Sequence, residues 1–302
     1  MVDWSWAQAL SGIVPPLVSP LTASGDPDDG AMEALVEHVL AGGCSGLFLL
    51  GGCGEGAWLT AMQRGAVTRA AVRAAAGRVP VLAGVMLPAT RAAGEAARQA
   101  ADEGADAVVV GSPYYFDVDA AAQQRHVEAV LGATRLPALL YNIPQCTHQT
   151  LAPETVRTLA GDPRVLGIKD SAPDFRAFQQ FLAVRRQQPA FRVLQGNEAL
   201  AAASLLQGAD GLVPGLASVA PALFVALREA AAKGDAATCG RLQEEIEDLA
   251  LLYEQGHWLP ALKAALAALG LGAGVPAAPL APAEDGQRRA IVAILRRHRL
   301  LA

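Results

Sequence analysis

The segment PALLYNIPQCTHQTLAPETVRTLAGDPRVLGIKD, from Pro137 to Asp170, contains one complete strand–helix–strand unit. Its two ends, Pro137 to Tyr141 and Val165 to Lys169, are short apolar runs, and Pro153 between them suits the first turn of a helix. Neither run alternates between apolar and polar residues, which is typical of parallel strands covered by helices. The segment therefore indicates an α/β protein with a parallel sheet.

The same unit recurs on both sides of this segment. Six further apolar runs are predicted as strands, at residues 13–18, 46–50, 80–85, 106–110, 191–195 and 211–213. A predicted helix follows each of the eight strands, at residues 28–40, from 60, 91–103, 120–131, from 153, 174–186, 197–206 and 218–232. Eight consecutive units favour a closed (β/α)8 TIM barrel over an open, doubly wound sheet.

The pattern changes after residue 233. From there on only helices are predicted, at residues 235–253, 259–269 and 284–301. The first of these helices carries apolar residues at three- and four-residue steps, which form one face: Leu242, Ile246, Leu249 and Tyr253. We therefore expect a barrel at residues 1–233 and a C-terminal helical extension at residues 234–302 that packs on it.

Composition excludes several classes of protein. Of the 302 residues, 52% are hydrophobic and 18% charged, which excludes intrinsic disorder. A net charge of −5 leaves no positive excess for a nucleic-acid backbone, and the basic run at residues 296–299 is interpreted as cations at the end of the last helix. No apolar stretch is long enough for a membrane span, and the first residues lack the features of a signal peptide. Four cysteines without a CxxC pair favour a reducing compartment, so we expect a cytoplasmic protein without nucleic-acid or membrane partners.

Lys169 is the most informative polar residue, because the active site of such a barrel lies at the carboxyl ends of its strands. Burial at the end of an apolar strand is expected to lower the pKa of its amine, and a neutral amine can form a Schiff base with a ketone. Tyr141 ends the preceding strand, where a phenol is a suitable proton donor and acceptor. The residues alone also allow a lysine that extends into solvent and a tyrosine that only caps its strand.

Signals for a cofactor are weak. The glycine-rich turn Gly51 to Gly56 could present backbone N–H groups to an anion, but it lacks the sequence of a P-loop and the spacing of a dinucleotide site. Cys53, Cys146 and His148 lack the spacing of zinc ligands, and no GxSxG nucleophile motif occurs. We therefore expect neither a metal nor an organic cofactor.

Four motifs occur in a recognisable order after the predicted strands: GGCGEG, SPYY, YNIP and GIKDS. Together they resemble the dihydrodipicolinate synthase/N-acetylneuraminate lyase family of pyruvate-dependent class I aldolases. The resemblance extends from about Ile13 to the C-terminal helices and includes GNEAL and ADGLVPGLASVAP. It implies a (β/α)8 barrel with a C-terminal helical extension, the same fold that the strand count predicts.

The resemblance also implies roles for individual residues. Lys169 would form the Schiff base with pyruvate or another 2-oxo acid, and Tyr141 would carry protons to and from the imine. Tyr115 matches a tyrosine that a neighbouring subunit supplies, which implies a homo-oligomer, with a homotetramer built as a dimer of dimers as the usual arrangement. Gly196 and Val213 align with positions that line the pyruvate pocket.

Three positions depart from the family pattern. Gly52 and Cys53 stand where most members have Thr-Thr or Ser-Thr, so the hydroxyl relay of the family is interrupted at Gly52. Cys146 stands where dihydrodipicolinate synthases have an arginine, and a thiol cannot imitate the guanidinium fork that grips a second carboxylate.

These residues lead to one main hypothesis. We expect a Schiff-base lyase that acts on a small-molecule 2-oxo acid of the pyruvate type by retro-aldol cleavage, condensation or dehydration of a keto-deoxy acid. The alternatives are a 4-hydroxy-tetrahydrodipicolinate (dihydrodipicolinate) synthase and a non-catalytic barrel that binds a 2-oxo acid.

Overall fold

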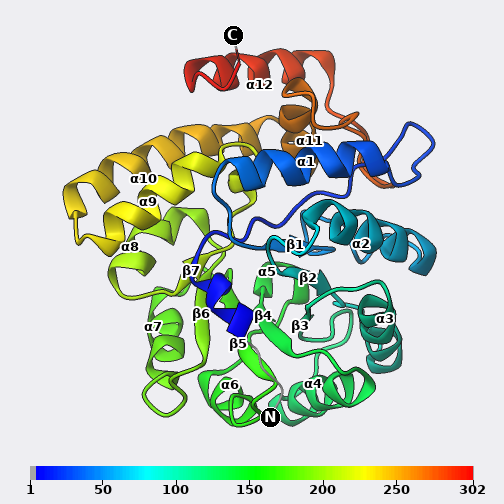
Figure 1. Cartoon of the computed structure of the whole chain (residues 1–302), viewed down its shortest axis with the longest axis vertical. Helices are drawn as coiled ribbons and strands as arrows, with labels where there is room; N and C mark the ends of the chain where they lie inside the picture. The colour runs from blue at the N-terminus through cyan, green and yellow to red at the C-terminus, as the bar shows by residue number, and fades with distance from the viewer. Residues whose placement is uncertain (1–4, 302) are drawn as a thin grey trace.

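Seven parallel strands form one sheet in the computed structural model, which describes residues 5–301 (Figure 1). The predicted boundaries at residues 1 and 302 lie outside the described residues. Neighbours in the sheet are also neighbours in the sequence, in the order β1-β2-β3-β4-β5-β6-β7. The strands are β1 (Leu47–Leu49), β2 (Val81–Gly84), β3 (Ala107–Gly111), β4 (Ala138–Asn142), β5 (Val165–Asp170), β6 (Arg192–Gln195) and β7 (Gly211–Leu212).

The prediction of a strand at residues 13–18 is wrong. This segment forms only isolated bridges, from Ile13 to Leu212 and from Pro16 to Phe48. Its backbone nevertheless bonds to both edges of the sheet: Val14 N donates to Leu212 O at 2.9 Å, and Leu17 N donates to Phe48 O at 2.8 Å. The two prolines at 15 and 16 carry no N–H group, so a regular ladder cannot form there. The segment therefore joins β7 to β1 without being a strand.

A helix follows most strands, as predicted. The helices up to residue 233 are α1 (Asp29–Ala41), α2 (Ala61–Ala75), α3 (Thr90–Asp102), α4 (Ala120–Ala133), α5 (Pro144–Thr147), α6 (Pro153–Leu159), α7 (Phe175–Val184), α8 (Ala201–Leu206) and α9 (Pro221–Ala232). Local side chains begin several of them: Asp28 and Asp174 accept a backbone hydrogen bond as N-caps, and Thr60 with Gln63 forms a capping box.

Several predicted helices have other bounds in the structure. The short helix α5 follows β4 directly and was not predicted. The helix predicted at 197–206 is divided into a 3-10 turn, η2 (Glu198–Leu200), and α8, and α9 begins at Pro221 after another turn, η3 (Gly215–Ser218). Pro221 has no N–H group and begins α9. The break between η2 and α8 contains neither glycine nor proline, and propensity alone does not fix it.

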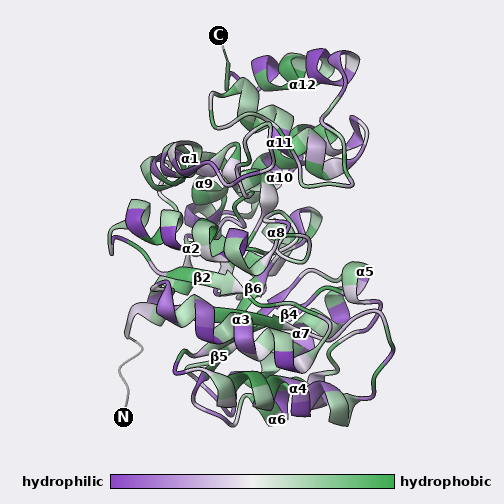
Figure 2. Cartoon of the chain, turned by 90° about the vertical axis from the view of Figure 1, so that its right-hand side faces the viewer, coloured by the Kyte–Doolittle hydropathy of each residue, from purple (hydrophilic) through white to green (hydrophobic). Residues whose placement is uncertain are grey.

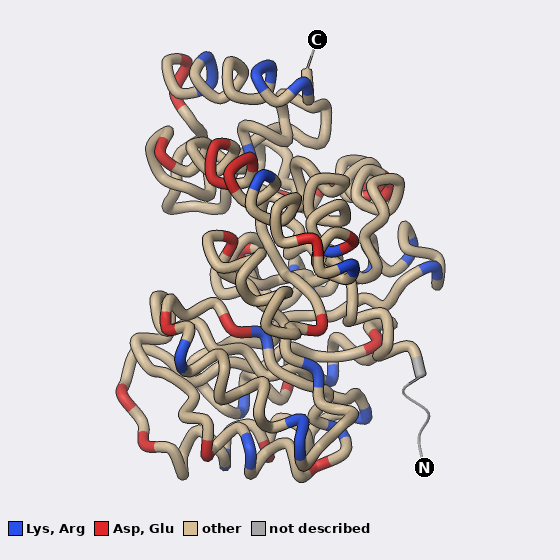
Figure 3. The backbone as a smooth tube through the Cα atoms, turned by 90° about the vertical axis from the view of Figure 1, so that its left-hand side faces the viewer, with Lys and Arg blue, Asp and Glu red and all other residues tan. Residues whose placement is uncertain are grey.

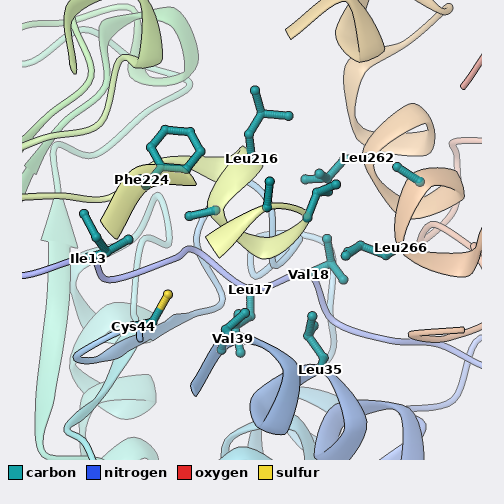
Figure 4. Close-up of a cluster of buried hydrophobic side chains, with 14 of the residues drawn as sticks. Ile13, Leu17, Val18, Leu35, Val39, Cys44, Leu216, Phe224, Leu262 and Leu266 are labelled. Carbon is teal, nitrogen blue, oxygen red and sulfur yellow. The ribbon is translucent and has the colours of Figure 1, made fainter. Parts of the chain in front are cut away.

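The C-terminal part is helical, as predicted. Its elements are α10 (Ala236–Ala250), the 3-10 turn η4 (Leu251–Glu254), α11 (Trp258–Ala268) and α12 (Asp285–Arg297), the last of which ends earlier than predicted. A large buried cluster joins these helices to the rest, with Leu17 and Val18 of the bridging segment, Leu35 of α1, and Leu262 of α11 among its members (Figure 4). No described helix is long and apolar enough to cross a membrane.

Successive strand residues point to opposite faces of the curled sheet. On β4, Leu139 and Tyr141 belong to the inner cluster with Phe48, while Ala138 and Leu140 belong to the outer cluster under the helices. Figure 2 shows the hydrophobic strands inside and hydrophilic residues along covering helices such as α3 and α4, and Figure 3 shows charges of both signs dispersed over the chain. This alternation directs Tyr141 into the interior.

Candidate active site

Lys169 and Tyr141 lie side by side at the carboxyl end of the sheet. The two residues are register partners on β5 and β4, and the Lys169 Nζ is 4.2 Å from the centroid of the Tyr141 ring and 4.9 Å from that of Phe48. Both side chains are buried. Lys169 therefore does not extend into solvent, which was the alternative left open by its sequence position.

Burial lowers the pKa of Lys169 to about 8, against the weaker opposing effects of Cys53, Glu198 and Cys146. A neutral amine is consequently available close to neutral pH, as a nucleophile requires. Burial also raises the pKa of the Tyr141 phenol, which keeps it protonated. The Tyr141 hydroxyl lies 3.5 Å from the Ser171 Oγ, so it has a polar neighbour through which a proton can move.

Gly196 makes room for this lysine. A Cβ atom at Gly196 would lie 2.6 Å from the Lys169 Cε and 2.2 Å from the Ser171 Oγ, closer than such atoms approach. Gly196 follows β6, the neighbour of β5, and its N–H donates to Asp170 O at 2.7 Å. The predicted pocket position thus lies directly against the lysine.

The glycine-rich turn brings Gly52 and Cys53 to the same end of the sheet. A Cβ atom at Gly52 would find only Trp258 Cη2 of α11 within reach, at 4.0 Å. Burial raises the pKa of the Cys53 thiol to about 12, so the thiol is neutral at physiological pH. The turn is anchored by Glu55, whose carboxylate forms a buried ion pair with Lys263 of α11 and accepts from Ala277 N at 2.6 Å.

The remaining predicted residues have different surroundings. Cys146 is exposed on α5, and it acts electrostatically on both Lys169 and Tyr141. Val213 belongs to the inner cluster with Tyr141. Tyr115 is 83% exposed, with its ring in edge contact with Phe116 at 4.9 Å, so a single chain does not bring it into the buried centre.

A cavity of about 360 Å³ adjoins this centre. Its lining residues include Gly52, Ile143 and Cys146, and Trp58, Tyr114 and Trp258 supply aromatic walls. Its position at the carboxyl ends of parallel strands is the usual place for a ligand in an α/β sheet. Within residues 5–301, no group of three or more His, Cys, Asp or Glu side chains is placed to hold a metal ion.

The comparisons with known proteins agree with this geometry. Residues 9–298 match the model of the dihydrodipicolinate synthetase family. The chain belongs to this family. A 4-hydroxy-tetrahydrodipicolinate synthase of Xylella fastidiosa is 36% identical over 90% of this chain and 90% of its own length. A probable 2-dehydro-3-deoxy-D-pentonate aldolase of Escherichia coli is 35% identical over 81% of this chain and 82% of its own length.

The solved structures include close relatives of the same family. A prophage protein of the dihydrodipicolinic acid synthase family from Escherichia coli K12, in complex with pyruvate, has a TM-score of 0.91 and 31% identity, and the match covers 96% of this chain and 99% of that one. Membership of the dihydrodipicolinate synthetase family confirms the predicted resemblance and the prediction of an enzyme of the class I lyase and aldolase type.

Two polar residues near the centre were not predicted as site residues. The Glu198 Oε1 accepts from Leu216 N at 2.7 Å and from the Tyr253 hydroxyl at 3.2 Å, and burial raises the pKa of Glu198 to about 7. A Cβ atom at Gly215 would lie 2.7 Å from that hydroxyl and 3.4 Å from the Cys53 sulfur, so these groups surround one point. In the sequence, Tyr253 falls on the apolar face of a predicted helix, so nothing indicated a polar role for it. For Glu198, only the GNE motif after β6 could have indicated a site residue.

Proposed function

We propose that Lys169 is the Schiff-base nucleophile of a lyase that acts on a 2-oxo acid of the pyruvate type. The observation that carries this proposal is the buried contact between a lysine of lowered pKa and the Tyr141 ring. The neutral Nζ attacks the ketone carbon, a C–N bond forms, and the carbonyl oxygen leaves as water. The protonated imine then accepts the electron pair of the bond that breaks, so no other cofactor is needed.

Tyr141 is the proton carrier in this proposal. Its phenol is protonated at neutral pH and lies beside the imine nitrogen, so it can give a proton to the departing oxygen and take one from a substrate hydroxyl. We assign the substrate carboxylate to the turn that contains Gly52 and Cys53, and we place Gly196 and Val213 in the wall of the pyruvate pocket. Their positions around Lys169 support this assignment.

Retro-aldol cleavage, condensation or dehydration of a keto-deoxy acid is the reaction that we favour over dihydrodipicolinate synthesis. Cys146 lines the cavity where an arginine would be needed to grip a second carboxylate, and none of the described residues that line this cavity is a lysine or an arginine. A non-catalytic binding protein would have little use for a lysine with lowered pKa beside a buried phenol.

The same proposal extends to architecture and assembly. Within residues 5–301, we assign the part up to residue 233 to a (β/α)8 barrel in which the segment from 13 to 18 takes the place of one strand, and the part from residue 234 on to a helical extension. The exposed pair Tyr115 and Phe116 supports a homo-oligomer in which Tyr115 completes the neighbouring site, with a dimer of dimers as the expected arrangement. The cytoplasmic location stays a prediction.

A panel of 2-oxo-3-deoxy acids, assayed for release of pyruvate, tests the reaction. We expect at least one member to release pyruvate in the wild type and none in Lys169→Arg, because a guanidinium remains protonated and cannot form an imine. A folded Lys169→Arg variant with most of the wild-type activity would contradict the proposal.

A further inference from the structure

The cavity beside the reactive pair has aromatic walls from three separate parts of the chain. Trp58 comes from the turn after β1, Tyr114 follows β3, and Trp258 begins α11. Met86 and Ile143 also line the cavity. A flat, apolar group would therefore contact aromatic rings on more than one side, an arrangement that favours an aromatic ligand.

The two tryptophans are incompletely covered. Trp58 is 48% exposed and Trp258 is 37% exposed, so both indole rings present apolar surface that a ligand in the cavity can cover. Gly52 adds to this surface, because any side chain there would extend towards Trp258 Cη2, 4.0 Å from the ideal Cβ position. Gly52, which lacks the hydroxyl of the family relay, and the exposed Trp258 ring therefore line the same side of the cavity.

The lining of the cavity includes few polar side chains, which are Glu55, Tyr114, Cys146, Thr147 and His257. Among its lining residues, Glu55 is the one carboxylate, and that carboxylate is paired with buried Lys263. The Thr147 hydroxyl already donates to the backbone oxygens of Ile143 and Gln149, at 3.0 and 2.8 Å. A second carboxylate would lose its water and find no lysine or arginine among the described lining residues to replace it.

We propose that the substrate carries an uncharged aromatic group next to the reacting carbons, so that the enzyme splits or forms an aldol between a pyruvate-type 2-oxo acid and an aromatic aldehyde. This inference rests on the proposed Schiff-base function. Tyr141 is left as a phenolate once it has given its proton to the departing carbonyl oxygen. In cleavage, this phenolate takes the proton of the 4-hydroxyl, the bond between C3 and C4 breaks, and its electron pair moves into the imine to give an enamine. The aldehyde leaves, C3 takes a proton, and water hydrolyses the imine to release pyruvate.

Three aldol adducts of pyruvate distinguish the substrate classes. They are 4-hydroxy-2-oxo-4-phenylbutanoate (the phenyl adduct), 4-hydroxy-2-oxopentanoate (the methyl adduct) and a 2-oxo-3-deoxyhexonate (the hexonate). The wild type is expected to release pyruvate from the phenyl adduct with a kcat/KM at least about tenfold above that for the hexonate. In Trp258→Ala the ratio of kcat/KM for the phenyl over the methyl adduct should fall about tenfold, because one aromatic wall is lost. Trp58→Ala should lower the same ratio, and it replaces Trp258→Ala if that variant does not fold.

Leu206→Ala is the matched control, because Leu206 is 43% exposed but lies on α8, and the cavity is lined by other residues. Its ratio should equal that of the wild type. A higher kcat/KM for the hexonate than for the phenyl adduct, or an unchanged ratio in both tryptophan variants, would overturn the aromatic assignment and leave the Schiff-base function intact. The proposed function, and this inference with it, would instead be overturned if the enzyme cleaved none of the three adducts and if borohydride with pyruvate left no reduced adduct on Lys169.

Discussion

Lys169 and Tyr141 face each other across the β4–β5 pairing, with the lysine nitrogen 4.2 Å from the centre of the phenol ring. Two opposite effects act on the amine at this point. Removal from water disfavours the ammonium form, while the aromatic faces and the nearby Glu198 favour it. Desolvation is the larger effect, so the pKa of Lys169 falls to about 8.

The pH dependence of kcat/KM should report this value. Only the neutral amine attacks a carbonyl, so activity is expected to rise with pH and to level off above a pKa of about 8. Initial rates at saturating coupling enzyme between pH 5 and 10 measure the profile. A profile that is already flat from pH 6, or one that still rises steeply at pH 10, would disagree with a desolvated nucleophile.

Glu198→Gln should move the same profile to lower pH. The amide oxygen can still accept from Leu216 N, but the negative charge that raises the pKa of Lys169 is lost. The measurement is the midpoint of the rise in kcat/KM, compared with that of Glu33→Gln, an exposed position on α1 that should leave it unchanged. A midpoint that moves to higher pH in Glu198→Gln would refute the electrostatic coupling.

Gly196→Ala should reduce turnover by about 100-fold or more, because the added methyl would force the Lys169 Cε to move from a contact of 2.6 Å. The fold should persist, which circular dichroism can check. Gly132→Ala is the control, since a Cβ there meets no atom within 4 Å. Equal turnover in both variants would show that the lysine has more freedom than the packing indicates.

Lys263→Met should destabilise the protein by about 3–5 kcal/mol, because the buried Glu55 carboxylate would lose its charged partner. Unfolding in urea, followed by fluorescence, gives the shift in midpoint. Arg91→Met removes a pair whose arginine is 92% exposed and should cause no measurable shift. If the two variants unfold together, the ion pair does not anchor the turn at Gly52.

Much of this arrangement follows from local sequence patterns. Apolar runs predicted β1 to β7 within about two residues, and the helix starts predicted at residues 28, 60 and 174 lie next to the observed starts of α1, α2 and α7. The segment at residues 13–18 was wrongly predicted as a strand, because its apolar pattern is that of a strand while Pro15 and Pro16 remove two donors.

The site could be predicted only in part. Lys169 and Tyr141 end apolar strands, so their positions follow from the strand pattern. The partnership of Glu198 with Tyr253 joins residues 55 positions apart, and that of Gly52 with Trp258 depends on where α11 packs. Such contacts are set by tertiary packing, which spacing along one helix does not report.

Reduction with borohydride in the presence of pyruvate tests the central claim most directly. The chain contains three lysines, of which Lys233 is exposed and Lys263 is buried in its ion pair, so peptide mass spectrometry can locate a single modified residue. The Schiff-base proposal predicts a reduced pyruvate adduct on the peptide that contains Lys169 and none on the other two. An unmodified Lys169 peptide from folded protein, or an adduct confined to Lys233, would contradict it.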